Sequence, residues 1–343
     1  MAVAALCIAY LAPLTDPRER WGPAVLGLAY PYLLLVNVVF IGWWILQKSR
    51  MMIFSIVAIL AGFQSLYSLF RFCPGKSDNK GIVICSYNVK DFEGIGENTD
   101  KRWNRIAIQD YLRKQNPDIV CLQEIDSGSI AGFNPFPYHA TIPATDDSYS
   151  TKIDKNSNLI IFSRFPIAGE GKITFQDTPN MIVFADLVIN KDTFRLYNCH
   201  MQSYQLKFSG VVTTDPGRFR SFWWRVKTSI KERARQIDLF EKQIRHSPFP
   251  VIIAGDFNDP PVSRSYKKMK NSLKMTDAFS ESGQGFCHTY KEALFSFRVD
   301  YIFHDELFNG YNFKVDRVNY SDHYPVVCKL IKTDHLVAAD DGE

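Results

Sequence analysis

Two long runs of apolar residues dominate the beginning of the chain. Neither Trp21–Gln47 nor Met51–Phe70 contains a charged side chain. Each run matches or exceeds the ~20 apolar residues that a helix needs to cross a bilayer. The short polar connection between them carries Lys48 and Arg50. The pattern therefore predicts a transmembrane helical hairpin within a membrane anchor that covers residues 1–71.

The sequence leaves the number of spans and their orientation open. Met1–Leu14 is also apolar but short for a complete span, so the anchor has two or three transmembrane helices. With three spans, Lys48 and Arg50 lie in the cytoplasm and the rest of the chain lies outside it, although Arg18 and Arg20 nearly balance this bias. The alternative is a buried core hairpin of a soluble protein, which the length of the two uncharged runs disfavours.

Beyond a polar linker at residues 72–80, short β-rich runs alternate with amphipathic stretches. Helical periodicity is found in Lys101–Gln115 and in Ser229–Arg245. Strands interleaved with helices predict layered α/β packing for residues 81–332, and the tail at 333–343 is predicted to be disordered. The predicted strands are Gly81–Asn88, Ile119–Gln123, Asn158–Ser163, Met181–Ile189, Thr193–His200, Pro250–Asp256, Val299–Phe303 and Pro325–Ile331.

Several of these apolar strands end in side chains that can bind a metal ion or move a proton. The first strand ends at Asn88, and the second is followed by Glu124. Asp256 and Asn258 are two positions apart, so on an extended backbone they point to the same face and can address one centre. The other strand ends supply His200, Asp300, Asp322 and His323.

The residue types favour a hard divalent cation. Carboxylate and amide oxygens without a thiolate cluster suit Mg²⁺ or Mn²⁺, and Mg²⁺ takes only one or two protein carboxylates, so that a phosphate supplies further ligands. Such an ion polarises a phosphoryl oxygen while a nearby imidazole or carboxylate activates water. The seven cysteines are scattered singly, which disfavours a structural metal site or a disulfide framework.

Six short motifs follow one another along the chain. They are S-Y-N-V at 86–89, L-Q-E at 122–124, N-C-H at 198–200, G-D-F-N at 255–258, R-V-D-Y-I at 298–302 and S-D-H-Y-P-V at 321–326. In this order they resemble the endonuclease/exonuclease/phosphatase superfamily over about residues 81–332. Residues 247–250 and 285–290 and the apolar hairpin are similar to a bacterial branch with an N-terminal membrane anchor. The resemblance implies a four-layer α/β/β/α sandwich, two sheets face to face with helices outside, preceded by the transmembrane hairpin.

The resemblance also implies a metal site. Glu124 resembles the principal metal ligand, with Asn88 beside it, and Asp322 is expected to complete the surroundings of the ion. Gln123 is expected only to orient the metal carboxylate through a hydrogen bond, and Arg298 to be structural.

The catalytic roles follow from the same resemblance. His323 resembles the family's catalytic imidazole, and Asp300 resembles the carboxylate that holds it in the right tautomer. Asp256 would position or deprotonate the attacking water, Asn258 would bind the phosphate, and His200 would help neutralise the charged transition state. Whether His323 or Asp256 is the general base stays open.

A basic and aromatic segment lies between residue 200 and the helix predicted from Ser229. Its position after a catalytic strand end predicts that it lies at the rim of the site. There it could stack on bases or settle into a lipid headgroup region, or it could be a helix that packs its aromatic side chains on the domain or the anchor. Its side chains are Arg218, Phe219, Arg220, Phe222, Trp223, Trp224, Arg225 and Lys227.

The predicted function is hydrolysis of a phosphodiester or phosphomonoester by Mg²⁺-assisted water attack at a membrane. Beyond residue 71 the acidic and basic residues nearly balance, which suits a lipid headgroup or a small phosphoester better than DNA. The alternatives are a metal-dependent DNA endonuclease or exonuclease and a non-catalytic, membrane-tethered binding module. The expected location is the bacterial inner membrane, with the catalytic domain on the extracytoplasmic side, and no protein partner is predicted.

Overall fold

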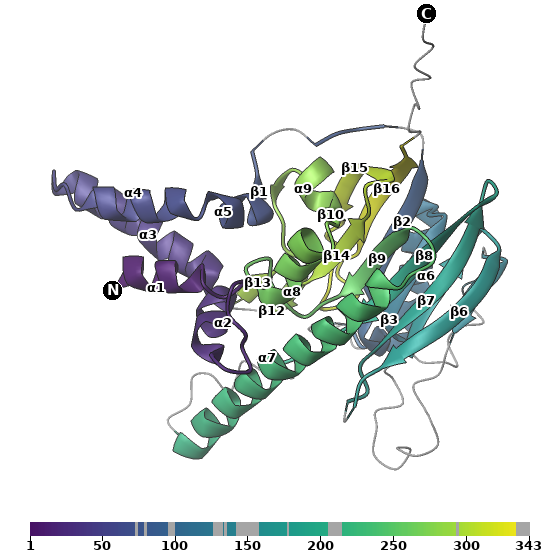
Figure 1. Cartoon of the computed structure of the whole chain (residues 1–343), viewed down its shortest axis with the longest axis horizontal. Helices are drawn as coiled ribbons and strands as arrows, with labels where there is room; N and C mark the ends of the chain where they lie inside the picture. The colour runs from purple at the N-terminus through teal and green to yellow at the C-terminus, as the bar shows by residue number, and fades with distance from the viewer. Residues whose placement is uncertain are drawn as a thin grey trace, which may run out of the picture.

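Two six-stranded β-sheets form the centre of the computed structural model (Figure 1), which describes residues 1–72, 75–78, 81–94, 100–125, 133, 136–141, 158–176, 178–204, 215–292 and 295–333. The first sheet contains, in spatial order, β15 (Phe308–Val315), β16 (Val326–Lys332), β2 (Ile82–Asn88), β3 (Ile119–Ile125), β5 (Asn158–Ser163) and β4 (Tyr138–Thr141). The second sheet contains β10 (Thr276–Asp277), β14 (Asp300–His304), β9 (Val251–Asp256), β8 (Asp192–His200), β7 (Met181–Ile189) and β6 (Ile167–Thr174).

Both sheets are mixed, as the predicted α/β class requires. Strand β2 pairs with β3 in parallel, and so does β8 with β9. The other neighbouring strands within the two sheets are antiparallel. Within the two sheets, the strands β4, β6, β10 and β15 were not predicted from the sequence, whereas the predicted strands are all present with bounds that differ by at most two residues.

The sheets face each other, and a helix covers the outer face of each. Fully buried side chains such as Ile84 of the first sheet and Ile252 of the second meet in the core between the sheets. Helix α6 (Lys101–Gln115) packs Ile108 on the outside of the first sheet, and α7 (Pro216–Arg245) packs Phe240 on the outside of the second. The layers therefore follow the order helix, sheet, sheet, helix.

Local capping explains where the two helices begin. The Asp100 side chain accepts hydrogen bonds from two N–H groups in the first turn of α6, which has the predicted bounds. Helix α7 begins at Pro216 instead of near Ser229, because Asp215 caps it and proline is favoured in the first turn. The basic and aromatic segment is therefore the first half of α7.

The N-terminal region forms bent helices instead of continuous spans. Helix α1 (Ala2–Ala9) is followed by α2 (Trp21–Leu28) and α3 (Tyr30–Leu46), which are bent by 65°, and by α4 (Met52–Ala61) and α5 (Phe63–Leu69), which are bent by 70°. Pro31 near the start of α3 cannot continue the hydrogen bonds of α2, and Gly62 separates α4 from α5. Among the described residues no single helix is long and apolar enough to cross a membrane, but each bent pair together reaches that length and composition.

The N-terminal helices also pack on the domain. Strand β1 (Phe70–Arg71) pairs with β11 (Gly285–Phe286), and Val262, just beyond the end of β9, lies in one apolar cluster with side chains of α1, α3, α4 and α5. Parts of the predicted linker and almost all of the predicted tail, residues 73–74, 79–80 and 334–343, lie outside the described residues. The remaining short elements are η1 (Lys90–Phe92), α8 (Arg264–Lys267), the π-helix η4 (Lys268–Ser272), α9 (Ala278–Ser282), β12 (Tyr290–Glu292) and β13 (Phe295–Phe297).

Candidate active site

The carboxyl ends of both parallel strand pairs carry polar side chains at one edge of the two-sheet core. Asn88 ends β2 and Glu124 lies near the end of β3 in the first sheet, while His200 ends β8 and Asp256 ends β9 in the second. Parallel pairing places strand ends of the same polarity side by side, and the register sets His200 directly opposite Asp256. The fold thus brings these strand ends together, as the sequence predicted.

Asn88 bridges carboxylates from the two sheets. Its Nδ2 donates to Oε1 of Glu124 at 3.0 Å and to Oδ2 of Asp256 at 3.1 Å. His200 approaches the same Glu124 oxygen, with its Nε2 at 3.2 Å from Oε1. One buried amide and one buried imidazole therefore fix the position of Glu124.

The backbone at Glu124 is unusual for a strand. Its φ is 52°, in the left-handed region, and the pairing of β3 with β5 shifts register between Leu122 and Ile125. A bulge of this kind redirects a side chain, and a non-glycine residue in this conformation costs on the order of 1–3 kcal/mol. Gly255 shows a related constraint in β9, where a Cβ would lie 2.2 Å from the carbonyl oxygen of Cys199.

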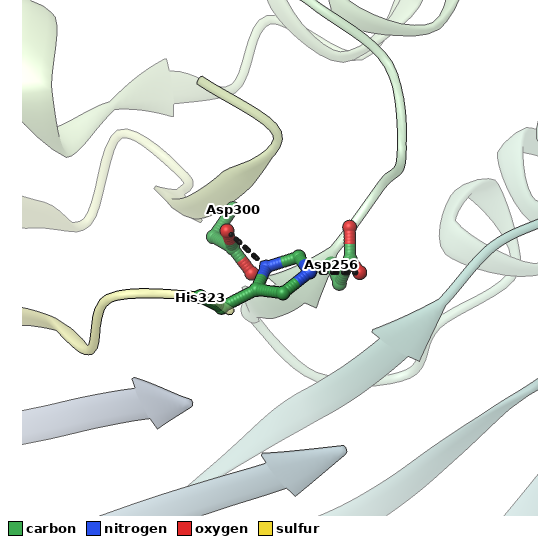
Figure 2. A group of neighbouring side chains, drawn as sticks. All are labelled: Asp256, Asp300 and His323. Carbon is green, nitrogen blue, oxygen red and sulfur yellow. Dashed lines mark hydrogen bonds and ion pairs between the residues drawn. The ribbon is translucent and has the colours of Figure 1, made fainter. Parts of the chain in front are cut away.

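His323, Asp300 and Asp256 form a second group, in which the ring of His323 lies between the two carboxylates (Figure 2). Nδ1 of His323 is 2.9 Å from Oδ2 of Asp300, and Nε2 is 3.7 Å from Oδ2 of Asp256. The backbone N–H of Asp300 donates to Oγ1 of Thr289 at 3.1 Å. All three members are buried, and the other Asp300 oxygen, Oδ1, has no hydrogen-bond partner among the described residues.

Burial and charge shift the pKa values of these groups in opposite directions. Burial raises the pKa of Asp256 to about 6. Burial lowers the pKa of His323, but the carboxylates of Asp300 and Asp256 outweigh it and raise the value to about 10. For Glu124, burial is outweighed by the contact with His200 and the hydrogen bond from Asn88, which lower its pKa to about 2. The pKa of His200 is raised, because Glu124 outweighs the effect of burial. Without a cation, the pKa of each imidazole therefore lies above its ordinary value.

Asn258 supports Asp256. Its backbone N–H donates to Oδ1 of Asp256 at 2.7 Å, and its Nδ2 donates to the carbonyl of Met201 at 2.9 Å. Asn258, whose amide was expected to bind phosphate, thus holds the Asp256 carboxylate and the segment after β8 in place.

Asp322, which was predicted to complete the surroundings of the ion, contacts a lysine. Its Oδ2 forms an ion pair with Nζ of Lys90 at 2.6 Å. Direct contacts therefore join all the predicted site residues except Asp322 into one network, which comprises Asn88, Glu124, His200, Asp256, Asn258, Asp300 and His323.

Gln123 and several unpredicted residues support this network. Nε2 of Gln123, which was expected to orient the metal carboxylate, donates instead to Oδ1 of Asn198 at 2.8 Å and joins the two sheets. Thr289, Ser321 and Lys90 were not predicted, although Ser321 belongs to the S-D-H motif and donates to the carbonyl of Asn88 at 2.8 Å. Thr289 lies within the stretch 285–290 that resembles the bacterial branch, and Lys90 directly follows the S-Y-N-V motif, but neither was assigned a role.

The donor set fits a divalent cation. Three carboxylates, those of Glu124, Asp256 and Asp300, gather in this network, and the ligand atoms of Asp256, Asp300 and His323 lie within 4.8 Å of one another. Oxygen donors of this type suit a hard cation, and the buried Oδ1 of Asp300, which has no hydrogen-bond partner among the described residues, is available as a ligand atom.

Comparisons with known proteins agree with this geometry. A model described as the Endonuclease/Exonuclease/phosphatase family matches residues 85–323, and a model described as a domain of unknown function matches residues 1–69. No curated protein matches the chain.

Similar solved structures share the fold. An endonuclease/exonuclease/phosphatase family protein from Bacteroides thetaiotaomicron has a TM-score of 0.54 and 16% identity, covering 74% of this chain and 98% of that one. A mannosyl-6-phosphatase from the same organism has a TM-score of 0.53 and 16% identity, with 73% and 99% covered. The catalytic domain of human Nocturnin, solved with a bound sulfate anion, has a TM-score of 0.52 and 19% identity, with 75% and 96% covered.

Proposed function

We infer that this chain, which belongs to the Endonuclease/Exonuclease/phosphatase family, hydrolyses a phosphoester bond with the help of a divalent cation while its N-terminal helices hold it at a membrane. Members of the family are typically phosphoester hydrolases and are generally dependent on a divalent metal. The observation that carries the proposal is the contact network that runs from Glu124 through Asn88 and Asp256 to His323 and Asp300.

Glu124 and Asn88 are the residues that would hold the cation, Mg²⁺ or alternatively Mn²⁺. When bound there, it polarises the phosphoryl oxygen of the substrate. The group of Asp256, Asp300 and His323 also offers ligand atoms, but Asp300 already holds Nδ1 of His323, and that contact suits proton transfer better than metal binding. Asp322 is the third predicted ligand, and its Oδ2 is paired with Lys90.

The remaining residues handle the proton of the attacking water. Asp300 fixes the His323 ring, whose Nε2 faces Asp256. Asp256, with a pKa raised to about 6, is poised near neutrality, as a general base requires. His323 is the other candidate for the base, because Asp300 holds its Nδ1 and leaves Nε2 facing Asp256. His200, whose pKa is raised, supplies positive charge beside Glu124.

The substrate that we propose is a lipid headgroup or another small phosphoester. The near-neutral domain and the apolar N-terminal helices support this substrate class, and a relative described as a mannosyl-6-phosphatase acts on a small phosphoester. Cleavage of DNA is the competing activity within the same family. We further propose that the chain represents the family's bacterial branch with a membrane anchor at residues 1–71, located in the inner membrane with its catalytic domain on the extracytoplasmic side.

The test uses the full chain in detergent micelles with phospholipids, an aryl phosphodiester, an aryl phosphomonoester and plasmid DNA. We expect turnover with Mg²⁺ that is lost in EDTA and in Glu124→Gln, but kept in the control Glu170→Gln, which changes an exposed residue of β6. Turnover that persists in EDTA would overturn the metal requirement. Cleavage of DNA alone would make the protein a nuclease, and no turnover of any substrate would favour the binding module.

A further inference from the structure

The first half of α7, Pro216–Lys227, is a projecting arm, here called the α7 arm. Every residue from Asp215 to Ser221 is exposed. Two large apolar side chains of the arm face solvent, since Phe219 is 53% exposed and Trp224, farther along, is 66% exposed. Figure 1 shows that this end of α7 extends beyond the second sheet on the same side as the α3–α4 hairpin. Helix packing within the domain therefore does not account for these aromatic residues.

The α7 arm and the turn that follows it carry charge of a single sign. From Pro216 to Lys231 the chain has five basic residues and no acidic residue. Arg218 and Arg220 lie in the fully exposed part of the arm. Basic and aromatic side chains in this density on one helix are typical of segments that lie in the headgroup region of a membrane.

The α3–α4 hairpin presents an extended apolar surface. Large side chains on both helices face outward, and Leu46 and Leu60 are 81% and 64% exposed. Monomeric soluble proteins rarely expose a contiguous apolar surface of this kind. The turn between the helices carries Lys48 and Arg50.

Helix α2 connects the two features. The Nζ atom of Lys227 in the α7 arm lies 5.6 Å from the ring centre of Trp21, the first residue of α2. Arg18, just before α2, forms an ion pair of 2.7 Å with Asp238 farther along α7. Because α2 leads directly into α3, these contacts fix the position of the α7 arm relative to the α3–α4 hairpin.

We propose that the α7 arm lies on the headgroup layer of an anionic phospholipid bilayer into which the α3–α4 hairpin inserts. The arginines of the arm contact lipid phosphates, and Phe219 and Trp224 occupy the boundary with the acyl chains. The inference rests on the membrane attachment within the proposed function. It adds a second contact with the membrane, in which the α7 arm prefers anionic lipids. A single-stranded nucleic acid is the other polyanion that basic and aromatic side chains bind, and the test distinguishes it.

A fluorophore on the α7 arm measures this contact in the full chain. Ser221→Cys carries an environment-sensitive dye in a background with Cys7→Ser and Cys73→Ser, since the other cysteines are buried. Gln243→Cys, exposed at the opposite end of α7, carries the control dye. The proteins are reconstituted into vesicles of phosphatidylcholine alone or mixed with phosphatidylglycerol.

We expect the emission at position 221 to shift to the blue in the anionic vesicles, and the shift to weaken at high salt. The dye at position 243 should show no shift. Arg218→Glu with Arg220→Glu should abolish the shift while the chain still floats with the vesicles, and Lys242→Glu at the far end of α7 should leave it intact.

Several results would overturn the inference. If the chain floats with anionic vesicles but the dye at position 221 shows no shift, the proposed contact of the α7 arm with lipid is wrong and the membrane attachment stands. If the chain does not float with the vesicles, the proposed membrane attachment is wrong as well. A shift caused by single-stranded DNA but not by lipid assigns the arm to nucleic acid. None of these measurements depends on turnover. They can therefore be interpreted even if the phosphoesterase assay detects no activity.

Discussion

Arg298 donates from its guanidinium to the backbone carbonyl of Ser68 at 2.8 Å, so a side chain two positions before Asp300 is bonded to the end of α5. The same guanidinium forms an ion pair with Asp277, and both side chains are fully buried. Arg298 therefore joins the N-terminal helices to the segment that delivers Asp300 to the active site, which agrees with the structural role expected for it.

Replacing Arg298 by methionine should destabilise the protein strongly. Arg298→Met leaves the Asp277 carboxylate buried without its cation, and breaking a buried pair in this way costs about 3–5 kcal/mol. Thermal unfolding of the full chain in detergent measures the effect. Adding Asp277→Asn should restore part of the loss, because no uncompensated charge is then buried. An unfolding temperature equal to that of the unmodified chain would mean that the pair contributes nothing.

Asp300→Asn should lower turnover without weakening substrate binding. The substitution removes the negative charge that orients the His323 ring and holds its pKa at about 10. Loss of acid–base catalysis typically reduces kcat by ~10²–10⁴-fold. Steady-state kinetics should show this fall with KM nearly unchanged. The control is Asp192→Asn, which changes the residue at the start of β8, at the opposite end of the strand from His200, where Asp192 pairs with Lys332. An increase in KM alone would assign Asp300 to substrate binding.

The stability of the cation-free protein should depend on the protonation of His323. The folded-state pKa of about 10 exceeds the unfolded value near 6.5, so the stabilisation is complete below about pH 6.5 and is lost as the pH rises through about 10. In EDTA, the free energy of unfolding should fall more between these pH values for the unmodified chain than for His323→Gln. The control His246→Gln changes an exposed residue at the end of α7 and should follow the unmodified chain. Parallel curves for all three proteins would contradict this assignment.

Local sequence was sufficient for some elements and not for others. Helix α6 could be predicted from its helical periodicity, and in the structure Asp100 caps its start and Asn116, with a φ of 50°, ends it in the left-handed conformation. The start of α7 was missed because proline and glycine at residues 216 and 217 resemble a loop signal, although the Asp215 cap makes them a helix start. The bend at Pro31 could have been read from the sequence, because proline interrupts a helix.

The candidate site divides in the same way. The motif order brought Asn88, Glu124 and Asp256 into one prediction because each stands at a strand end. The bulge at Glu124 and the ion pair of Asp322 with Lys90 depend on contacts between distant segments, which no local pattern encodes. Likewise, the hydrogen bond from Arg298 to a backbone carbonyl of α5 could not be predicted from the sequence, because every residue type carries such a carbonyl.

Helix α2 contains a matched pair of glycines that tests how the N-terminal helices support the active site. A Cβ on Gly27 would lie 2.6 Å from the carbonyl oxygen of Val262 and 2.6 Å from Cβ of Ala12, whereas a Cβ on Gly22 would meet nothing within 4 Å. Val262 belongs to the segment that follows Asp256 and Asn258. A methyl group at Gly27 would therefore press on the segment that follows Asp256 and Asn258, and a methyl group at Gly22 would not.

Gly27→Ala should destabilise the full chain and reduce its turnover. The new methyl group must push the Val262 backbone or the turn at Ala12 aside, and overpacking of this kind costs about 1–3 kcal/mol. Displacement of the loop should loosen the bonds from Asn258 to Asp256 and lower kcat. Gly22→Ala should instead stabilise α2 slightly, by about 0.5–1 kcal/mol, with kcat unchanged. Thermal unfolding and steady-state kinetics are measured for both variants. If Gly27→Ala keeps full turnover although it is less stable, the N-terminal helices stabilise the fold but do not position the segment that contains Val262.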